Sequence, residues 1–140
     1  MPYLLDTNIV SELRRTRPDS RVTAWYTTVP DDALYLSVLV IGEIRQGIER
    51  LRRRDDGQAR ALDDWLATLA STYADRIAPV TIEIAEEWGR LNVPDPLPYV
   101  DGLMAATALV HGWTLATRNA KHVERTGVPL TNPFEFAGPR

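Results

Sequence analysis

Short apolar runs alternate along this chain with longer segments in which apolar residues recur every three or four positions. The short runs predict strands at residues 3–5, 34–36, 77–80, 114–117 and, less regularly, 128–131. The periodic segments between them predict helices at residues 7–15, 20–28, from Val38 onward, 84–91 and 101–110. A further amphipathic helix is predicted after residue 57, with Leu62, Trp65, Leu66, Leu69 and Tyr73 on one side. Strands that alternate with helices predict an α/β fold in three layers, with a central, mainly parallel sheet of about four or five strands flanked by helices.

Capping and breaking residues set the boundaries of these elements. Ser37 is a suitable N-cap for the helix from Val38, and the Asp-Asp-Gly at 55–57 breaks that helix. Three prolines within residues 93–98 predict a loop, and Gly112 ends the helix that follows it. Pro79 places the third strand at an edge of the sheet, because proline cannot donate a ladder hydrogen bond.

Composition narrows the class of protein. The 140 residues fit one domain with a genuine core, and 44% hydrophobic with 25% charged residues is typical of a globular chain. The absence of cysteine excludes disulfides, thiolate zinc sites and thiol nucleophiles. No apolar run is long enough for a membrane span, and residues 1–5 do not resemble a signal peptide, so we expect a cytoplasmic protein without membrane contact. The net charge of −3 does not by itself indicate nucleic-acid binding.

Four polar residues stand where the predicted sheet would place a ligand. Asp6 follows the first strand, Glu43 lies on the helix after the second, Asp101 opens the helix before the fourth, and Asn119 lies just past the fourth. Ligands of open α/β sheets bind beyond the carboxyl ends of the strands. We therefore expect these four groups to converge at one end of the sheet.

Each acid also has a purely structural interpretation. Asp6 and Asp101 both stand where a helix N-cap is expected. Glu43 could be an ordinary solvated helix residue, although Gly47, one turn later on the same face, suggests that something packs closely beside it. If the carboxylates do gather, their repulsion raises their pKa values, and a bound hard cation such as Mg²⁺ removes that cost. Metal-assisted hydrolysis of a phosphodiester is the reaction that such a site serves best.

Five segments together resemble the PIN-domain family, VapC-type toxins in particular and their FitB-like branch. They are DTNIVSE at 6–12, SVLVIGEIRQG at 37–47, DGLMAATA at 101–108, TLATRN at 114–119 and NPFE at 132–135. One such motif would be weak, but all occur in order across residues 3–136, nearly the whole chain.

The resemblance implies a single PIN domain over residues 1–140 that binds Mg²⁺, or Mn²⁺ in its place, through Asp6, Glu43 and Asp101. It implies a toxin ribonuclease that cleaves RNA by a metal-activated water, leaves a 5′-phosphate and inhibits translation and growth. It further implies a homodimer and a cognate VapB-like antitoxin, in a heterotetramer or larger assembly that reaches operator DNA through the antitoxin. The RNA target and the antitoxin's identity do not follow from the sequence.

The resemblance also extends to neighbours of the acids. Asn119 is expected to act with the catalytic acids, but many relatives carry a fourth acid there, so we expect one-metal chemistry. Thr7, Asn8 and Thr117 are expected to orient the carboxylates. The candidate substrate contacts are Arg14, Arg15, Arg118 and His122; His122, which stands where an Asp is frequent, is otherwise a surface residue near the site. The four tryptophans are interpreted as core or dimer residues.

Other protein classes fit the sequence less well. A haloacid-dehalogenase phosphotransferase would need a second Asp in place of Asn8, and a response-regulator receiver would need a Lys after a late strand, where Lys121 does not clearly lie. A catalytically weak PIN module that acts mainly by binding antitoxin and DNA remains an alternative, as does a deoxyribonuclease. Metal-dependent cleavage that Asp101→Asn abolishes separates enzyme from binding module, and RNA tested against DNA separates the two nucleases.

Overall fold

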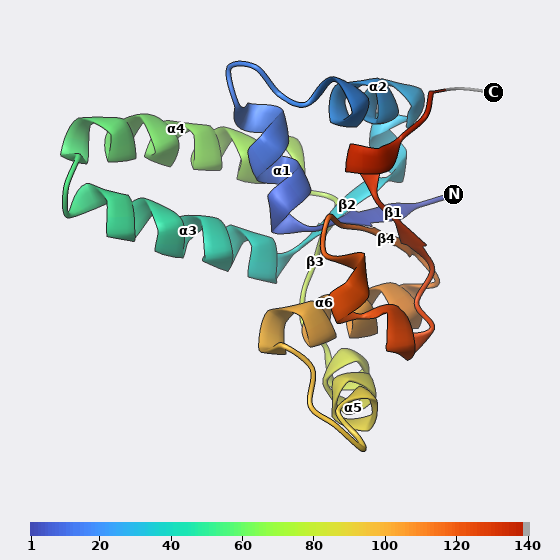
Figure 1. Ribbon diagram of the computed structural model, residues 1–140. Helices are drawn as coiled ribbons and strands as arrows, with labels where there is room; N and C mark the ends of the chain where they lie inside the picture. Colours follow the sequence, from blue (N-terminus) through green and yellow to red (C-terminus); the bar gives the residue numbers. More distant parts are fainter. Residues whose placement is uncertain (139–140) are drawn as a thin grey trace.

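The computed structural model describes residues 1–138 and contains a central sheet of five parallel strands (Figure 1). The strands are β1 (Tyr3–Leu5), β2 (Leu34–Ser37), β3 (Ile77–Ala78), β4 (Thr114–Ala116) and β5 (Leu130–Thr131), arranged in the order β3-β2-β1-β4-β5. The predicted α/β class and the parallel sheet are confirmed. Because β1 is the central strand, the residue after it lies between the ends of two neighbouring strands.

Within residues 1–138, six α-helices flank the sheet. They are α1 (Thr7–Arg14), α2 (Ser20–Thr28), α3 (Val38–Arg52), α4 (Asp56–Thr72), α5 (Ile82–Leu91) and α6 (Tyr99–His111). Figure 1 shows α3 and α4 as a hairpin that extends to the left, away from the sheet, while α5 and α6 lie below the sheet in this view and pack against each other. Short 3-10 turns occupy Asp31–Ala33, Ala120–His122, Glu124–Thr126 and Pro133–Glu135. None of the helices within residues 1–138 is both long and apolar enough to cross a membrane.

The core is formed where the strands meet the inner faces of the helices. Leu4 of β1, Leu36 of β2 and Leu115 of β4 are almost completely buried, and Ile9 and Ile48 cover them from the helices with no more than 2% exposure. Burying apolar surface in this way is the dominant favourable contribution to folding. The strands are therefore anchored by core packing next to their carboxyl ends.

Several predicted boundaries are confirmed and two are wrong. Ser37 caps α3 by accepting from the Leu39 amide at 3.0 Å, and Gly112 ends α6 in the left-handed conformation with φ 71°. The helix break, however, lies before Asp56: Asp55 is the N-cap of α4, so the acid and glycine at 56–57 belong to its first turn. Acidic residues are favourable in the first turn of a helix, which explains why Asp56 begins α4 and does not break the helical structure.

Helix α6 also differs from the prediction in a way that matters for the site. It begins at Tyr99, with Pro98 at the N-cap position and no side-chain cap. A proline cannot continue a helix but can directly precede one, so the proline-rich loop extends only to residue 98. Asp101 consequently lies inside the first turn, and the interpretation of Asp101 as an N-cap is wrong. The short β3 ends before Pro79 and lies at the edge of the sheet, as predicted.

Candidate active site

Asp6 is the central acid of the candidate site. It follows β1 directly, and its amide donates to the Ala116 carbonyl of β4 at 2.9 Å, which extends the parallel ladder by one step. Its side chain is only 6% exposed and caps α1 by accepting from the Thr7 amide at 2.7 Å. The second carboxylate oxygen, Oδ2, accepts from Thr117 Oγ1 at 2.6 Å and from Asn8 Nδ2 at 3.3 Å. Asp6 is thus both the helix cap and a buried, firmly oriented carboxylate.

The pKa of Asp6 reports on its surroundings. Burial raises this pKa above its ordinary value of 3.8, the hydrogen bonds from Thr117 and Thr7 oppose that rise, and the nearby carboxylates of Asp101 and Glu43 add to it. The net effect is a raised pKa. Three acids from β1, α3 and α6 therefore lie within electrostatic reach of one another at the carboxyl edge of the sheet.

The two other acids are each hydrogen-bonded to a neighbouring side chain. Glu43, half-buried in the second turn of α3, accepts from Thr7 Oγ1 at 2.5 Å. Asp101 Oδ2 lies 2.8 Å from His122 Nδ1, with side-chain exposures of 21% for the acid and 51% for the histidine. His122 is thus a direct partner of an acid and not merely a surface residue near the site.

A short chain of hydrogen bonds joins the ends of β1 and β4 next to Asp6. Asn8 donates to Asp6 and accepts from the Arg118 amide at 3.2 Å. Thr117, 1% exposed, donates to Asp6 and accepts from the Asn119 amide at 3.0 Å. These contacts place Asn8 and Thr117 where the sequence predicted them, around a carboxylate. The side chain of Asn119 instead lines an exposed cavity of about 420 Å³ together with Arg118 and His122.

The donors fit a hard cation by their chemistry. Carboxylate oxygens are the ligands that Mg²⁺ prefers. Burial is the main cause of the raised pKa of Asp6, and a cation would relieve the further contribution that comes from repulsion by Asp101 and Glu43. Within residues 1–138, however, no three acidic, histidine or cysteine side chains already surround one point at coordination distance. The carboxylates of Glu43 and Asp101 are instead directed toward Thr7 and His122.

The predicted substrate arginines have different surroundings. Arg15 forms an ion pair with Glu12 of its own helix at 3.2 Å, which ties it to α1. The guanidinium of Arg118 stacks over Phe134, 4.3 Å from the ring centroid. Arg14 is exposed, and its guanidinium lies 5.5 Å from the centroid of the Trp65 ring.

Gly47 does not accommodate a close neighbour. A Cβ placed there would meet nothing within 4 Å, so the expectation that something packs tightly beside Glu43 is wrong. The glycine lies on the exposed side of α3 and leaves the helix backbone bare toward a small cavity next to Glu43. Pattern alone could not distinguish a glycine that admits a packed neighbour from one that leaves open space.

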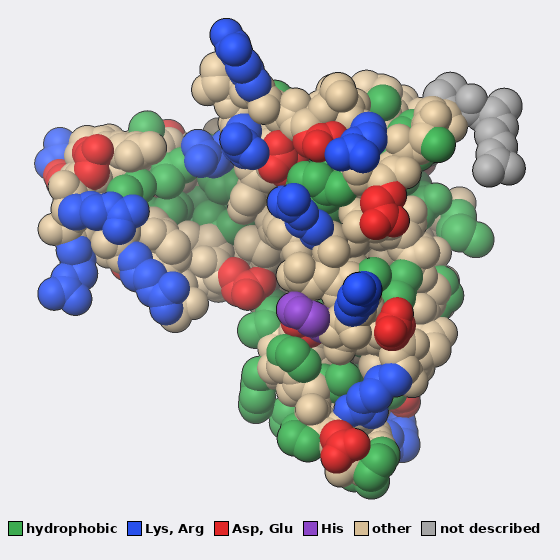
Figure 2. Space-filling model, viewed as in Figure 1, with side chains coloured by type: hydrophobic (Ala, Val, Ile, Leu, Met, Phe, Trp, Pro, Cys, Tyr) green, Lys and Arg blue, Asp and Glu red, His purple; other side chains and the backbone are tan. Residues whose placement is uncertain are grey.

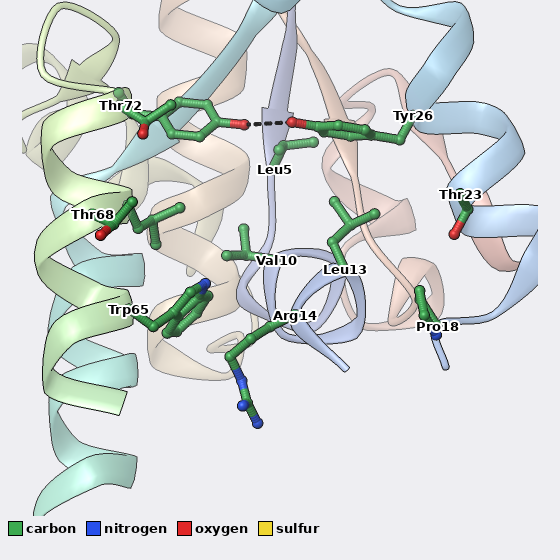
Figure 3. A pocket seen from close by; sticks show the side chains of 12 residues that line it. Leu5, Val10, Leu13, Arg14, Pro18, Thr23, Tyr26, Trp65, Thr68 and Thr72 are labelled. Carbon is green, nitrogen blue, oxygen red and sulfur yellow. Dashed lines mark hydrogen bonds between the residues drawn. The ribbon is translucent and has the colours of Figure 1, made fainter. Parts of the chain in front are cut away.

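A larger apolar groove with a volume of about 410 Å³ runs between α1, α2 and α4 (Figure 3). Its lining includes Leu5, Val10, Leu13, Tyr26, Trp65 and Leu69. Figure 2 shows the corresponding apolar hollow between the α3–α4 hairpin and the rest of the molecule, with Lys or Arg side chains on its rim. Part of the apolar side of α4 is only half-buried, and Trp65 and Leu69 on that side line this open groove.

Five parallel strands with three acids at their carboxyl edge match the fold that the sequence resemblance predicts, and comparison with known proteins agrees. The PIN domain family matches residues 3–128, and the chain belongs to this family. The chain is 32% identical to VapC ribonuclease Y4jK of Sinorhizobium fredii, covering 96% of this chain and 99% of that protein. It is 30% identical to toxin FitB of Neisseria gonorrhoeae, covering 94% and 97% of the two chains. A solved structure of FitAB bound to an IR36 DNA fragment is similar with a TM-score of 0.87 at 28% identity, covering 99% of each chain.

Proposed function

We propose that this chain is the toxin of a toxin–antitoxin pair and a metal-dependent ribonuclease that hydrolyses RNA phosphodiester bonds. The observation that carries the proposal is the gathering of Asp6, Glu43 and Asp101 at one edge of the sheet, with Asp6 buried despite the repulsion of the other two acids. A site that only needed to be stable would not bury a carboxylate beside two more. The names of two relatives, a ribonuclease and a toxin, support the proposal.

The three carboxylates would hold one Mg²⁺ or Mn²⁺. Bound there, the ion would supply a water nucleophile at neutral pH and stabilise the charge that develops on the phosphate. Thr117 and Thr7 keep Asp6 in one orientation, while Glu43 and Asp101 would exchange part of their present hydrogen bonds for coordination. Asn119 adds no charge, which favours one ion over two.

The test is cleavage of a mixed-sequence RNA by the purified protein, free of antitoxin, in Mg²⁺ or Mn²⁺. Asp101→Asn protein purified in the same way, and wild type in EDTA, are the controls. We expect cleavage by wild type alone, and products that carry a 5′-phosphate. A DNA of the same sequence, run in parallel, distinguishes a ribonuclease from a deoxyribonuclease.

A catalytically weak binding module is the second candidate, because no three ligand side chains within residues 1–138 are already arranged around an ion. It predicts that wild type and Asp101→Asn are equally inactive on RNA, and that calorimetry detects no Mg²⁺ or Mn²⁺ binding. That pair of results would replace the nuclease proposal with the binding module.

We further propose that the cognate antitoxin covers the apolar groove, and that the complex, built on a toxin homodimer, reaches operator DNA through the antitoxin. The groove is apolar and open, and it shares Arg14 and Trp65 with the smaller cavity that Glu43 lines, so a partner lying in it could also block the site. Thr68 is exposed and lines the groove, whereas Ala67 is its exposed neighbour on α4 outside the lining. Co-purification with the small protein encoded beside the toxin should fail for Thr68→Arg and succeed for Ala67→Arg. Equal recovery of both complexes would place the antitoxin elsewhere.

A further inference from the structure

A second, smaller cavity opens directly beside Glu43. Its volume is about 180 Å³, and it lies between α1, α3 and α4. The lining includes Thr7, Arg14, Glu43, Gly47, Leu62 and Trp65. Two of these residues, Thr7 and Glu43, are hydrogen-bonded to each other at the candidate active site. At about 30 Å³ per water molecule in the liquid, the cavity has room for roughly six waters, which suits one small planar group and not a helix.

The floor of this cavity is the bare backbone at Gly47. Nothing lies within 4 Å of the position that a Cβ would occupy there, and any side chain at residue 47 would project into the open space. Glycine is less favourable than alanine inside a helix, so α3 is weakened at this point without any gain in internal packing. What the glycine does provide is an open approach for a ligand to the surface of α3, one turn beyond Glu43.

The wall of the cavity carries an aromatic ring and a cation. Trp65 is half-buried and lines both this cavity and the larger groove. Figure 3 shows it pointing from α4 toward α1, with the Arg14 side chain beside it. Arg14 forms no ion pair with any acid in the part of the chain that the structure describes, so its charge is available to an anion.

From this arrangement we infer that the small cavity is a nucleotide subsite for single-stranded RNA, in which the base next to the cleaved phosphate stacks on Trp65 and a flanking phosphate contacts Arg14. Every base offers a flat face for stacking on an aromatic side chain, and the guanidinium of Arg matches phosphate geometry. The subsite rests on the proposed ribonuclease function and defines how that site holds its substrate. It also revises the interpretation of Trp65 as a core or dimer residue.

The first test measures binding of a fluorescently labelled, mixed-sequence single-stranded RNA to protein that carries Asp101→Asn, so that the RNA stays intact. Trp65→Leu keeps an apolar side chain but removes the ring, and should weaken binding by about 5- to 150-fold, the usual range for loss of one stacked base. Trp65→Phe keeps a stacking ring and should recover most of the affinity. Thermal unfolding of each variant shows whether a loss reflects binding or the fold.

Two glycines on the same helix provide a matched pair for the second test. Gly42 and Gly47 both lie on α3, and at both positions a Cβ would meet nothing within 4 Å. Only Gly47 lines the cavity. Leu at either position should preserve or raise helix stability, because Leu is a better helix former than Gly. Gly47→Leu should weaken RNA binding at least as strongly as Trp65→Leu, whereas Gly42→Leu should bind like the parent protein.

The outcomes separate this inference from the proposed function. If wild type cleaves RNA and the Trp65→Leu and Gly47→Leu proteins bind RNA as tightly as their controls, the subsite is refuted and the ribonuclease stands. If these variants instead lose only the antitoxin, the cavity belongs to the protein partner and the inference is again overturned. Once the cleaved bond is mapped, an RNA that lacks the adjacent base should bind the Asp101→Asn protein equally well with and without Trp65→Leu.

Discussion

Replacing Thr117 by Val tests how the buried acid is held. The Thr117 hydroxyl, in a side chain 1% exposed, donates to Asp6 Oδ2 at 2.6 Å. A hydrogen bond to a charged group contributes about 1.5–3 kcal/mol, against about 0.5–1.5 kcal/mol for a neutral one. Thr107 is the matched control, since it is equally buried but donates to the neutral Leu103 carbonyl at 2.7 Å. We therefore expect Thr117→Val to lower the free energy of unfolding by about 1–2 kcal/mol more than Thr107→Val does at neutral pH, measured by urea denaturation without metal.

The pH dependence of this difference has a definite sign. An acid whose folded-state pKa exceeds its unfolded value binds its proton more tightly when folded, so stability falls as pH rises through that interval. The pKa of Asp6 is already raised from 3.8, and loss of the Thr117 hydrogen bond raises it further. The extra cost of Thr117→Val over Thr107→Val should therefore be smallest in acid and grow toward neutral pH. An extra cost that is absent, or identical at every pH, would refute the claim that Thr117 stabilises an ionised Asp6.

Two further predictions concern the fold around the site. Gly102→Ala should lower the free energy of unfolding by about 1–3 kcal/mol, because the added Cβ would lie 3.2 Å from Trp88 Cδ1. Gly89→Ala, where the space is open, should instead stabilise the protein by up to about 1 kcal/mol. Equal effects in chemical denaturation would contradict the packing of α6 on α5. Burial and the hydroxyl of Tyr26, 3.4 Å away, raise the pKa of Tyr73 above its ordinary value of 10.0. An ultraviolet titration should show a tyrosine that ionises well above pH 10, and Tyr73→Phe should remove that step; a step that persists in the variant would contradict the assignment to Tyr73.

The elements and the edge that carries the site could be predicted from the sequence because both depend on local rules. Alternating strand and helix patterns imply parallel strands, and parallel strands bring their carboxyl ends to one edge. Asp6, Glu43 and Asp101 follow different strands in the chain and meet there for that reason. Local capping chemistry likewise placed Ser37 and Gly112 correctly.

The parts that could not be predicted depend on three-dimensional neighbours. Whether Gly47 faces a packed side chain or open space is decided by how α1 and α4 pack around α3 in three dimensions. The same apolar periodicity describes a core residue and Trp65, whose ring lines two cavities. The pairing of Asp101 with His122 depends on the path of the chain after β4. The order of the strands also lies beyond local pattern, because it is set by which crossovers pack best.

Metal binding tests the central claim, that three acids from three separate elements form one site, most directly. Mn²⁺ affinity would be measured by calorimetry for wild type and for Asp6→Asn, Glu43→Gln and Asp101→Asn. Glu12→Gln would serve as the control, because Glu12 is a buried acid held by the Asp19 amide and Arg15. The account predicts one bound ion per chain in wild type and in the control, with affinity lost or greatly reduced in each of the three site variants. Binding that is absent from wild type, or that survives all three substitutions, would contradict it.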